Sequence, residues 1–374
     1  MTPVTPHRMA GLSLIELMVA LLISTILTLG LVEVFAASRA AYQMSEGLAR
    51  VQENGRFAMD YLQRDLRMVG HFGCVNDQAH KLKTGHFSVH TAAGVGAPLD
   101  FSRSIQGFEA NGTAPGQTLN VGTPTSGWTP GLPAHLAALG PRAGSDIVML
   151  RFLRSSGAPI TNIATGGANT TLRVELDDWQ NLKEEGVANP TLFGMADCTY
   201  VDVFPGVGNE AMGTATANVA IDRYTSGNVS LYRAEAIAYY VANGASGRPA
   251  LWRARWNAAG AAQAEELVEG IESLQLLYGQ DQSVDVSDFT GFIANQVTAA
   301  TIGSAAGVAG EEAWRRVGLV QMAVVASSVN PATAPGAVAA GPFALGVEVN
   351  APDDGRYRTT YESTVAIRNR LYGQ

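Results

Sequence analysis

The pattern of apolar residues changes its character within the N-terminal part of the chain. From Leu12 to Val32 every residue is apolar or small apart from Glu16. Further on, apolar or small residues recur at steps of three and four positions, which is the spacing of one helical face. These residues are Leu48, Val51, Gly55, Ala58, Leu62, Leu66 and Val69. No proline lies between Pro6 and Pro98, so the pattern predicts a single helix over residues 12–69.

Glycines mark the weak points and the end of this helix. Gly47 and Gly55 lie inside it, and each costs about 1 kcal/mol relative to alanine. Gly70 and Gly73 follow the last periodic position and are typical helix stop signals. We therefore expect the chain to leave the helix at about residue 70.

After Cys74 the helical period disappears and strand-like runs take over. Residues 92–144 contain six prolines and ten glycines, which favours turns over long elements. The runs predicted as strands are 146–153, 171–176, 199–204, 229–241, 251–256, 316–326 and 357–367. Segment 266–278 is ambiguous, because its apolar positions share a helical face while its neighbours are strands. A helix followed by strands predicts the α+β class.

Composition narrows the function classes. The chain has 374 residues, enough for a large folded domain beyond one membrane segment, and its 41 glycines favour a loop-rich β domain. A formal net charge of −8 argues against a nucleic-acid partner. His7 and Arg8 precede the apolar run without any acidic residue, which predicts a cytoplasmic N-terminus and an external remainder.

Glu16 sets this apolar run apart from an ordinary membrane helix. An unpaired carboxylate near the bilayer centre costs about 2.5 kcal/mol or more, so Glu16 requires an interfacial position or a cation. A cut between Gly11 and Leu12 would create that cation as a backbone ammonium. Two alternatives are a plain signal anchor over residues 12–36 and a secretory signal peptide that ends at Ala36. Neither alternative explains Glu16.

Cys74 and Cys198 are the only two cysteines. In an oxidising periplasm they are expected to pair, and closing a loop of about 125 residues stabilises by at most roughly 5 kcal/mol in the chain-entropy model. The alternative is a pair of unrelated buried thiols.

Catalytic and cofactor signatures are absent from the sequence. It contains no Gly-x-Ser-x-Gly elbow, no His-Glu-x-x-His pair and no phosphate-binding glycine loop, so we expect neither an enzyme nor a cofactor. The triplet Asp281, Asp285 and Asp288 lacks the spacing of an EF-hand loop, and we predict no metal site there.

Two groups of residues have a functional and a structural interpretation. The histidines at positions 80, 86 and 90 lack metal-site spacing and are expected to be solvated loop residues. Trp252 and Trp256 could face a ligand from a strand, but core packing with Arg253 and Arg255 turned outward is the preferred interpretation.

The segment from Gly11 to Ala20, Gly-Leu-Ser-Leu-Ile-Glu-Leu-Met-Val-Ala, resembles the type III signal of type IV pilins and type II secretion pseudopilins. The resemblance implies that a prepilin peptidase cuts after Gly11 and N-methylates Leu12, where the family commonly has phenylalanine. It also implies that Glu16 is an assembly residue, paired with the ammonium of Leu12 in its own or a neighbouring subunit.

Three further segments are similar to PilW-type minor pilins: residues 65–74, 267–279 and 361–370. This resemblance implies a subunit that primes a type IV pilus or lies at its tip. The implied partners are other minor and major pilins, the inner-membrane assembly platform and the prepilin peptidase. Alternatives are a minor pseudopilin of type II secretion, which shares the Val-Glu-x-Ile-x-x-Leu pattern, and a pilus-tip adhesin or ligand-binding module.

The expected organisation has four parts. Residues 1–11 form a cleaved leader, 12–36 the transmembrane half of the helix, 37–70 its exposed amphipathic half, and 71–374 a β-rich periplasmic domain. The chain is expected to cross the inner membrane once, with the N-terminus cytoplasmic, before it enters the cell-surface pilus.

Overall fold

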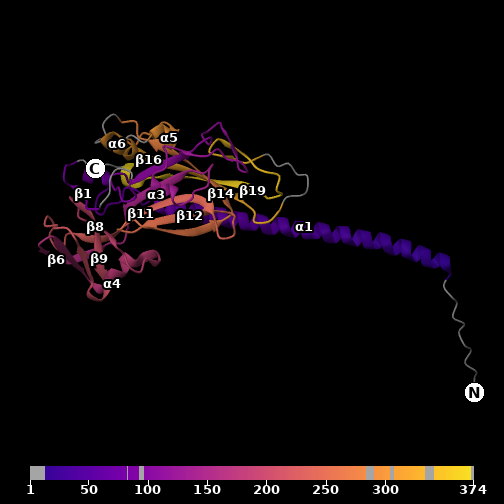
Figure 1. The fold of residues 1–374 in the computed structure, drawn as a ribbon, viewed down its shortest axis with the longest axis horizontal. Helices are drawn as coiled ribbons and strands as arrows, with labels where there is room; N and C mark the ends of the chain where they lie inside the picture. The colour runs from indigo at the N-terminus through magenta and orange to yellow at the C-terminus, as the bar shows by residue number, and fades with distance from the viewer. Residues whose placement is uncertain are drawn as a thin grey trace, which may run out of the picture.

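The computed structural model describes residues 13–81, 83–91, 97–283, 290–303, 307–332 and 341–371. A single long helix, α1 (Leu14–Leu66), is followed by a strand-rich domain, so the α+β prediction is confirmed (Figure 1). The first half of α1 projects from the domain, and only its second half packs on strands. Gly70 and Gly73 follow the helix with positive φ angles of 79° and 92°, as expected for residues that redirect the chain.

The domain consists of many short elements. The strands are β1 (Phe87–Val89), β2 (Ile105–Ala110), β3 (Thr118–Asn120), β4 (Trp128–Thr129), β5 (Ile147–Leu153), β6 (Ala158–Gly166), β7 (Asn169–Val174), β8 (Leu192–Ala196), β9 (Val201–Asn209), β10 (Thr214–Ala217), β11 (Ser230–Asn243), β12 (Pro249–Trp256), β13 (Ala262–Glu269), β14 (Ile271–Gln280), β15 (Gln296–Val297), β16 (Val317–Ser327), β17 (Phe343–Ala344), β18 (Val347–Asn350) and β19 (Arg358–Ala366). The short helices are α2 (Asp77–Lys81), α3 (Ala134–Ala137), α4 (Leu176–Trp179), α5 (Ala299–Ile302), α6 (Gly307–Arg315) and α7 (Arg368–Leu371), with 3₁₀ turns η1 (Gln180–Gly186) and η2 (Glu210–Met212).

Three sheets organise these strands. A 12-stranded sheet is centred on β11, which pairs with β5, β6, β8 and β12. A 4-stranded sheet has the order β15-β14-β16-β19, and a 3-stranded sheet has the order β17-β18-β3. The pairs β1–β9 and β3–β18 are parallel, and the other pairs are antiparallel.

All seven predicted strands exist, with ends shifted by a few residues. The ambiguous segment 266–278 forms parts of β13 and β14, with Gly270 at φ 83° between them. A Cβ atom at Gly270 would lie 2.8 Å from the carbonyl oxygen of Ser327, so glycine also permits a close backbone approach there.

The second half of α1 covers the 4-stranded sheet. Its buried residues include Val51, Ala58, Leu62 and Leu66, which belong to the predicted apolar face. Gly55 allows the ring of Tyr361 on β19 to lie directly against the helix, since a Cβ at Gly55 would meet that ring at 2.2 Å. The helix-weakening glycine is therefore a packing contact.

A separate hydrophobic core lies in the segment between β5 and β11, which we call the distal lobe (residues 155–229). It contains Trp179, Phe193 and Phe204, all buried. Figure 1 shows this lobe at the opposite end of the molecule from the N-terminus. The fold thus places the projecting half of α1 and the distal lobe at its two ends.

Candidate assembly helix and its anchorage

The N-terminal half of α1 is an apolar surface without a partner in this single chain. Every residue from Ser13 to Glu46 is exposed, including the apolar residues up to Phe35. The described part of the chain has one helix that is long and apolar enough to cross a membrane, judged by length and composition. Exposed apolar surface of this extent is unfavourable in water, so lipid or other subunits are needed to cover it.

Glu16 lies in the first turn of α1 and closes a capping box with Ser13. The backbone N–H of Ser13 donates to the Glu16 carboxylate at 3.0 Å, and the backbone N–H of Glu16 donates to Ser13 Oγ at 3.3 Å. A carboxylate at this end also interacts favourably with the helix dipole. The Ser-x-x-Glu spacing signals a capping box in sequence, and the sequence-based prediction missed it. The predicted cut between Gly11 and Leu12 lies outside the described residues.

At the other end of α1, Asp65 attaches the helix to strands β11 and β12 of the 12-stranded sheet. Its carboxylate is fully buried, accepts a 2.7 Å hydrogen bond from the Tyr239 hydroxyl, and lies 3.3 Å from Arg253 and 3.5 Å from Arg154. Several oppositely charged neighbours and a hydroxyl donor compensate the cost of burying this charge.

Arg253 and Arg255 do not point outward, so that prediction was wrong. Arg253 is 5% exposed, and both arginines lie within 3.4 Å of the Glu185 carboxylate. Glu185 also contacts Arg154 and, from α1, Arg64. The backbone of Glu185 adopts a positive φ of 59°, which is uncommon for a residue with a side chain. Glu185 therefore joins α1, the distal lobe and β12 through one carboxylate.

The C-terminal segment closes the same end of α1. The side-chain amide of Asn369 donates to the carbonyl oxygens of Arg67 and Val69 at 3.2 Å each, where the helix has run out of its own donors. Arg370 is buried and forms a 2.7 Å ion pair with Asp77 on α2. Burial alone would raise the pKa of Asp77, but the charges of Arg370 and Lys81 outweigh it and hold the pKa well below its usual range.

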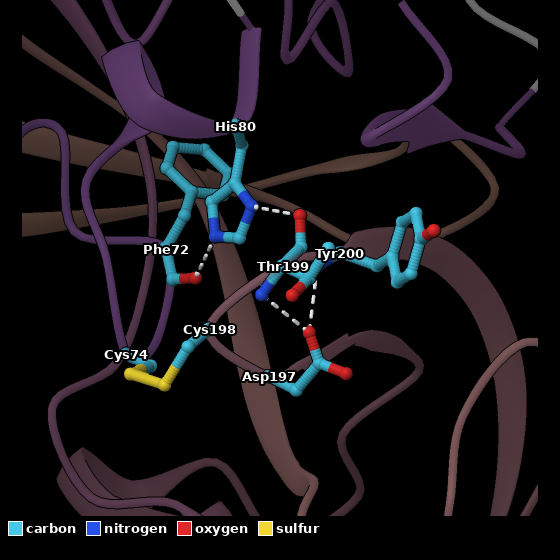
Figure 2. Close-up of a disulfide and its surroundings, with 7 residues drawn as sticks. All are labelled: Phe72, Cys74, His80, Asp197, Cys198, Thr199 and Tyr200. Atoms are coloured by element: carbon cyan, nitrogen blue, oxygen red, sulfur yellow. Dashed lines mark hydrogen bonds between the residues drawn. A yellow bond between two sulfur atoms is a disulfide. The ribbon is translucent and has the colours of Figure 1, made fainter. Parts of the chain in front are cut away.

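A disulfide joins the segment after α1 to the distal lobe (Figure 2). Cys74 and Cys198 have Cα atoms 4.8 Å apart. Beside them, His80 lies between the carbonyl oxygens of Phe72, at 3.3 Å, and Thr199, at 3.2 Å. Parallel pairing of β1 with β9 continues the same connection along the chain.

The three histidines belong to this connection, and the prediction of a solvated His80 was wrong. His80 is 1% exposed, and burial lowers its pKa. His86 approaches the Thr199 carbonyl at 3.0 Å, and His90 approaches the buried carboxylate of Asp202 at 2.6 Å. The histidines therefore contact the 199–202 region from the segment after α1.

The Asp281 side chain binds backbone groups that follow β14. Its carboxylate oxygens accept hydrogen bonds from the backbone N–H groups of Ser283, at 2.8 Å, and Gly291, at 2.6 Å. Asp285 and Asp288 lie outside the described residues. Within the described ranges, no three His, Cys, Asp or Glu side chains form a group that could hold a metal ion.

Two family models match the chain. Residues 238–369 match Type IV Pilus-assembly protein W (PilW), and residues 6–32 match the prokaryotic N-terminal methylation motif. The first match includes all strands of the 4-stranded sheet that α1 covers. The distal lobe lies outside both matches. No curated protein and no solved structure matches the chain.

The projecting apolar helix, the methylation-motif match and the strand-rich domain agree with an α+β pilin-like fold. The match to Type IV Pilus-assembly protein W covers about a third of the chain, so residues 238–369 are similar to PilW-type pilin-like proteins. The two matching families describe pilus structure and N-terminal modification rather than an enzyme.

Proposed function

We propose that this chain is a minor pilin that primes a type IV pilus or lies at its tip, and that it joins other pilins through the N-terminal half of α1. The observation that carries the proposal is the fully exposed apolar half-helix, which has Glu16 in its first turn. A minor pseudopilin of type II secretion would use the same helix. Pilus counts and secretion assays in a deletion strain separate these two functions.

The proposal includes the processing and placement of the chain. A prepilin peptidase removes residues 1–11 by cutting between Gly11 and Leu12, and Leu12 is then N-methylated. Residues 12–36 cross the inner membrane with the N-terminus in the cytoplasm. Residues 37–70 continue the helix outside the membrane, and residues 71–374 form the periplasmic domain. The methylation-motif match and the exposed helix support this arrangement.

The capping box gives Glu16 a local partner in addition to the proposed ammonium of Leu12. The two roles can be separated by substitution. Glutamine also functions at this position of a capping box but carries no charge. If assembly depends on the ion pair, Glu16→Gln and Glu16→Ala should both abolish most incorporation into pili. Ser13→Ala should retain it, because that variant keeps the charge and loses only the cap.

The measurement is the amount of subunit in sheared pili relative to the amount in membranes, with Glu46→Gln on the exposed part of α1 as a matched control. Mass spectrometry of the N-terminal peptide should show N-methyl-Leu12 in every variant, because the cut depends mainly on Gly11. Wild-type incorporation of Glu16→Gln would refute the ion-pair mechanism. A mature start at Ala37 would replace the pilin processing by secretory cleavage.

A further inference from the structure

A pocket of about 520 Å³ lies between the loop after α3 and the strands β11, β12 and β13. Its lining includes Gly140 and Arg142 from the loop, Tyr240 and Asn243 from β11, and Trp252 from β12. This volume is within the range of small-molecule sites, roughly 300–1,000 Å³. The pocket is separate from the half-helix that the proposed assembly uses.

One wall of the pocket is an aromatic pair. Trp252 and Tyr240 are direct partners across β11 and β12, with ring centroids 6.5 Å apart and ring planes inclined by 27°. Tyr240 is 1% exposed and supports the indole from the protein side, whereas Trp252 is only partly buried. The indole Nε1–H is buried and has no acceptor among the described residues. The wall thus offers an aromatic face to the pocket, whereas the indole N–H is turned away from solvent.

Among the residues that the structure describes, Arg142 is the only charged one that lines the pocket. Its Nη2 donates to the Val121 carbonyl oxygen at 3.0 Å, and its backbone N–H donates to Val241, so both ends of the residue are held in place. In the described part of the chain, Arg142 forms no ion pair with a carboxylate. A fixed guanidinium without a carboxylate partner favours a carboxylate ligand, which it can bind through two parallel N–H groups.

From this geometry we infer that the pocket binds an acidic saccharide of the uronic acid type. The sugar ring would pack its C–H groups on the Trp252 indole, and its carboxylate would pair with Arg142. Asn243 adds an amide for ring hydroxyls at the rim. The sugar ring accounts for the aromatic wall, and the carboxylate accounts for the guanidinium that forms no ion pair in the described part of the chain.

The position of the pocket suits a ligand from outside the pilus. Tyr239 and Val241, the neighbours of Tyr240 on β11, belong to the core that includes α1, whereas Tyr240 belongs to the core on the other sheet face. The pocket therefore opens on the face away from α1. If the helices of assembled pilins pack inside the filament, as the proposed function requires, this face points outward. The accessibility argument, but not the binding argument, rests on the proposed function.

Calorimetry on the full chain in detergent tests the proposal, with a galacturonate oligomer as the probe and a galactose oligomer of equal length as the neutral control. Wild type should bind the acidic oligomer at least tenfold more tightly than the neutral one. Arg142→Gln should remove this preference, and Trp252→Ala should weaken binding of the acidic oligomer at least tenfold. Arg173→Gln, an exposed arginine on the distal lobe, should bind like wild type.

Near-ultraviolet circular dichroism and thermal unfolding establish that each variant is folded, and Trp252→Phe supplies a smaller aromatic face if Trp252→Ala does not fold. Equal binding of both oligomers, no binding by wild type, or binding that is unchanged in Arg142→Gln would each overturn the proposal. Incorporation of Arg142→Gln into pili is measured in parallel. If Arg142→Gln loses saccharide binding but is incorporated normally, the pocket is separate from assembly. If wild type is not incorporated into pili, that result counts against the proposed function and not against saccharide binding.

Discussion

Asp65 shows how one carboxylate can fix a long helix on a sheet. It is fully buried, and its partners come from β5–β6, β11 and β12, in the form of Arg154, Tyr239 and Arg253. Arg154 and Arg253 are themselves almost fully buried, so neither can turn to water if the carboxylate is lost. The contact is therefore sensitive to the loss of a single partner.

We expect Asp65→Ala to lower the free energy of unfolding by about 3–5 kcal/mol, because it leaves buried guanidinium charges undercompensated and the Tyr239 hydroxyl without its acceptor. Chemical denaturation of the full chain in detergent, followed by near-ultraviolet circular dichroism, measures the change. Asp60→Ala is a matched control, because Asp60 is exposed on the same helix and should change stability by less than about 0.5 kcal/mol. Equal effects of the two substitutions would contradict the anchoring role of Asp65.

Two further buried carboxyl groups, Glu109 on β2 and Asp146 directly before β5, interact with each other. Burial and the charge of Asp146 raise the pKa of Glu109 to about 9. Burial also raises the pKa of Asp146, although the backbone N–H groups of Ala110 and Leu276 donate to it at 2.8 Å each. The Tyr278 hydroxyl is buried nearby, and its burial, followed by the charges of Asp146 and Glu109, raises its pKa. The folded state thus retains protons that the unfolded chain releases near pH 4.

A group whose pKa is raised by folding stabilises the protein fully below its unfolded pKa, and this contribution disappears as the pH rises through the folded pKa. Stability should therefore fall between about pH 5 and pH 9, by on the order of 1.4 kcal/mol per pH unit for each extra proton bound by the folded state. Glu109→Gln should make this slope shallower, since glutamine has no proton to lose. Denaturant titrations across this range measure it, with the exposed Asp177→Asn as control. An unchanged slope in Glu109→Gln would show that the pair does not titrate in this window.

At the scale of elements, the sequence was most informative where one face of an element is buried. The three- and four-residue spacing predicted both the existence of α1 and its buried face, including Val51 and Leu62. The strand-like run 357–367 likewise predicted β19, whose Ser363 hydroxyl accepts a 3.0 Å hydrogen bond from the Gln63 side-chain amide of α1. Periodicity works in these cases because water and protein alternate around the element.

The periodicity of apolar residues is lost where both faces of a strand are buried or both are exposed. In β14 nearly every residue is buried, so its apolar positions do not alternate and also fit a helical face. The first residues of β13 are exposed on both sides and carry no pattern. The same effect explains the error at Arg253, because β12 is covered on both faces and charge alone does not indicate exposure.

Candidate sites could be predicted only where their residues lie close together in the sequence. The assembly role of Glu16 and the Gly11–Leu12 cut were predicted from a contiguous motif and stay predictions. The burial of His80 was missed because its partners, Phe72 and Thr199, include a residue more than a hundred positions away. Trp252 was named with Trp256 as a residue that could face a ligand, although core packing was the preferred interpretation. Arg142 was not recognised, because it comes from a turn-rich loop that no periodicity places beside Trp252.

Helix α7 illustrates an element whose short length hides its importance. Arg370 reaches the Asp77 carboxylate and donates to the carbonyl oxygens of Trp314, at 2.8 Å, and Val317, at 3.2 Å. Arg370→Ala should cost about 3–5 kcal/mol, since Asp77 would remain buried without its direct ion-pair partner. Arg368→Ala is the control, because Arg368 is exposed in the same turn. Thermal unfolding of both variants measures the difference, and a smaller loss in Arg370→Ala than in Arg368→Ala would exclude this clamp.

At the scale of the whole molecule, the two halves of α1 differ in their contacts with the domain. In the described part of the chain, the apolar N-terminal half of α1 is exposed along its length, whereas the helix end is bound by Asp65, α7 and the segment that leads to Cys74. The distal lobe is tied to that same segment by the disulfide and by the β1–β9 pairing. A force transmitted along α1 would therefore reach the distal lobe through a short covalent route.

The disulfide spans 124 positions of the sequence, so its loss should chiefly increase the freedom of the unfolded chain. We expect Cys74→Ser and Cys198→Ser each to lower the free energy of unfolding by about 2–5 kcal/mol, and the double variant to lose no more than either single one, because all three break the same bond. Denaturation of wild type with and without a reductant provides the internal control. Mass mapping without reduction should find one peptide that joins Cys74 to Cys198. Membrane insertion should be unchanged, since the apolar half of α1 does not contact this region. Two free thiols in protein exported to the periplasm, or a double variant clearly less stable than both single variants, would contradict this account of how the distal lobe is held.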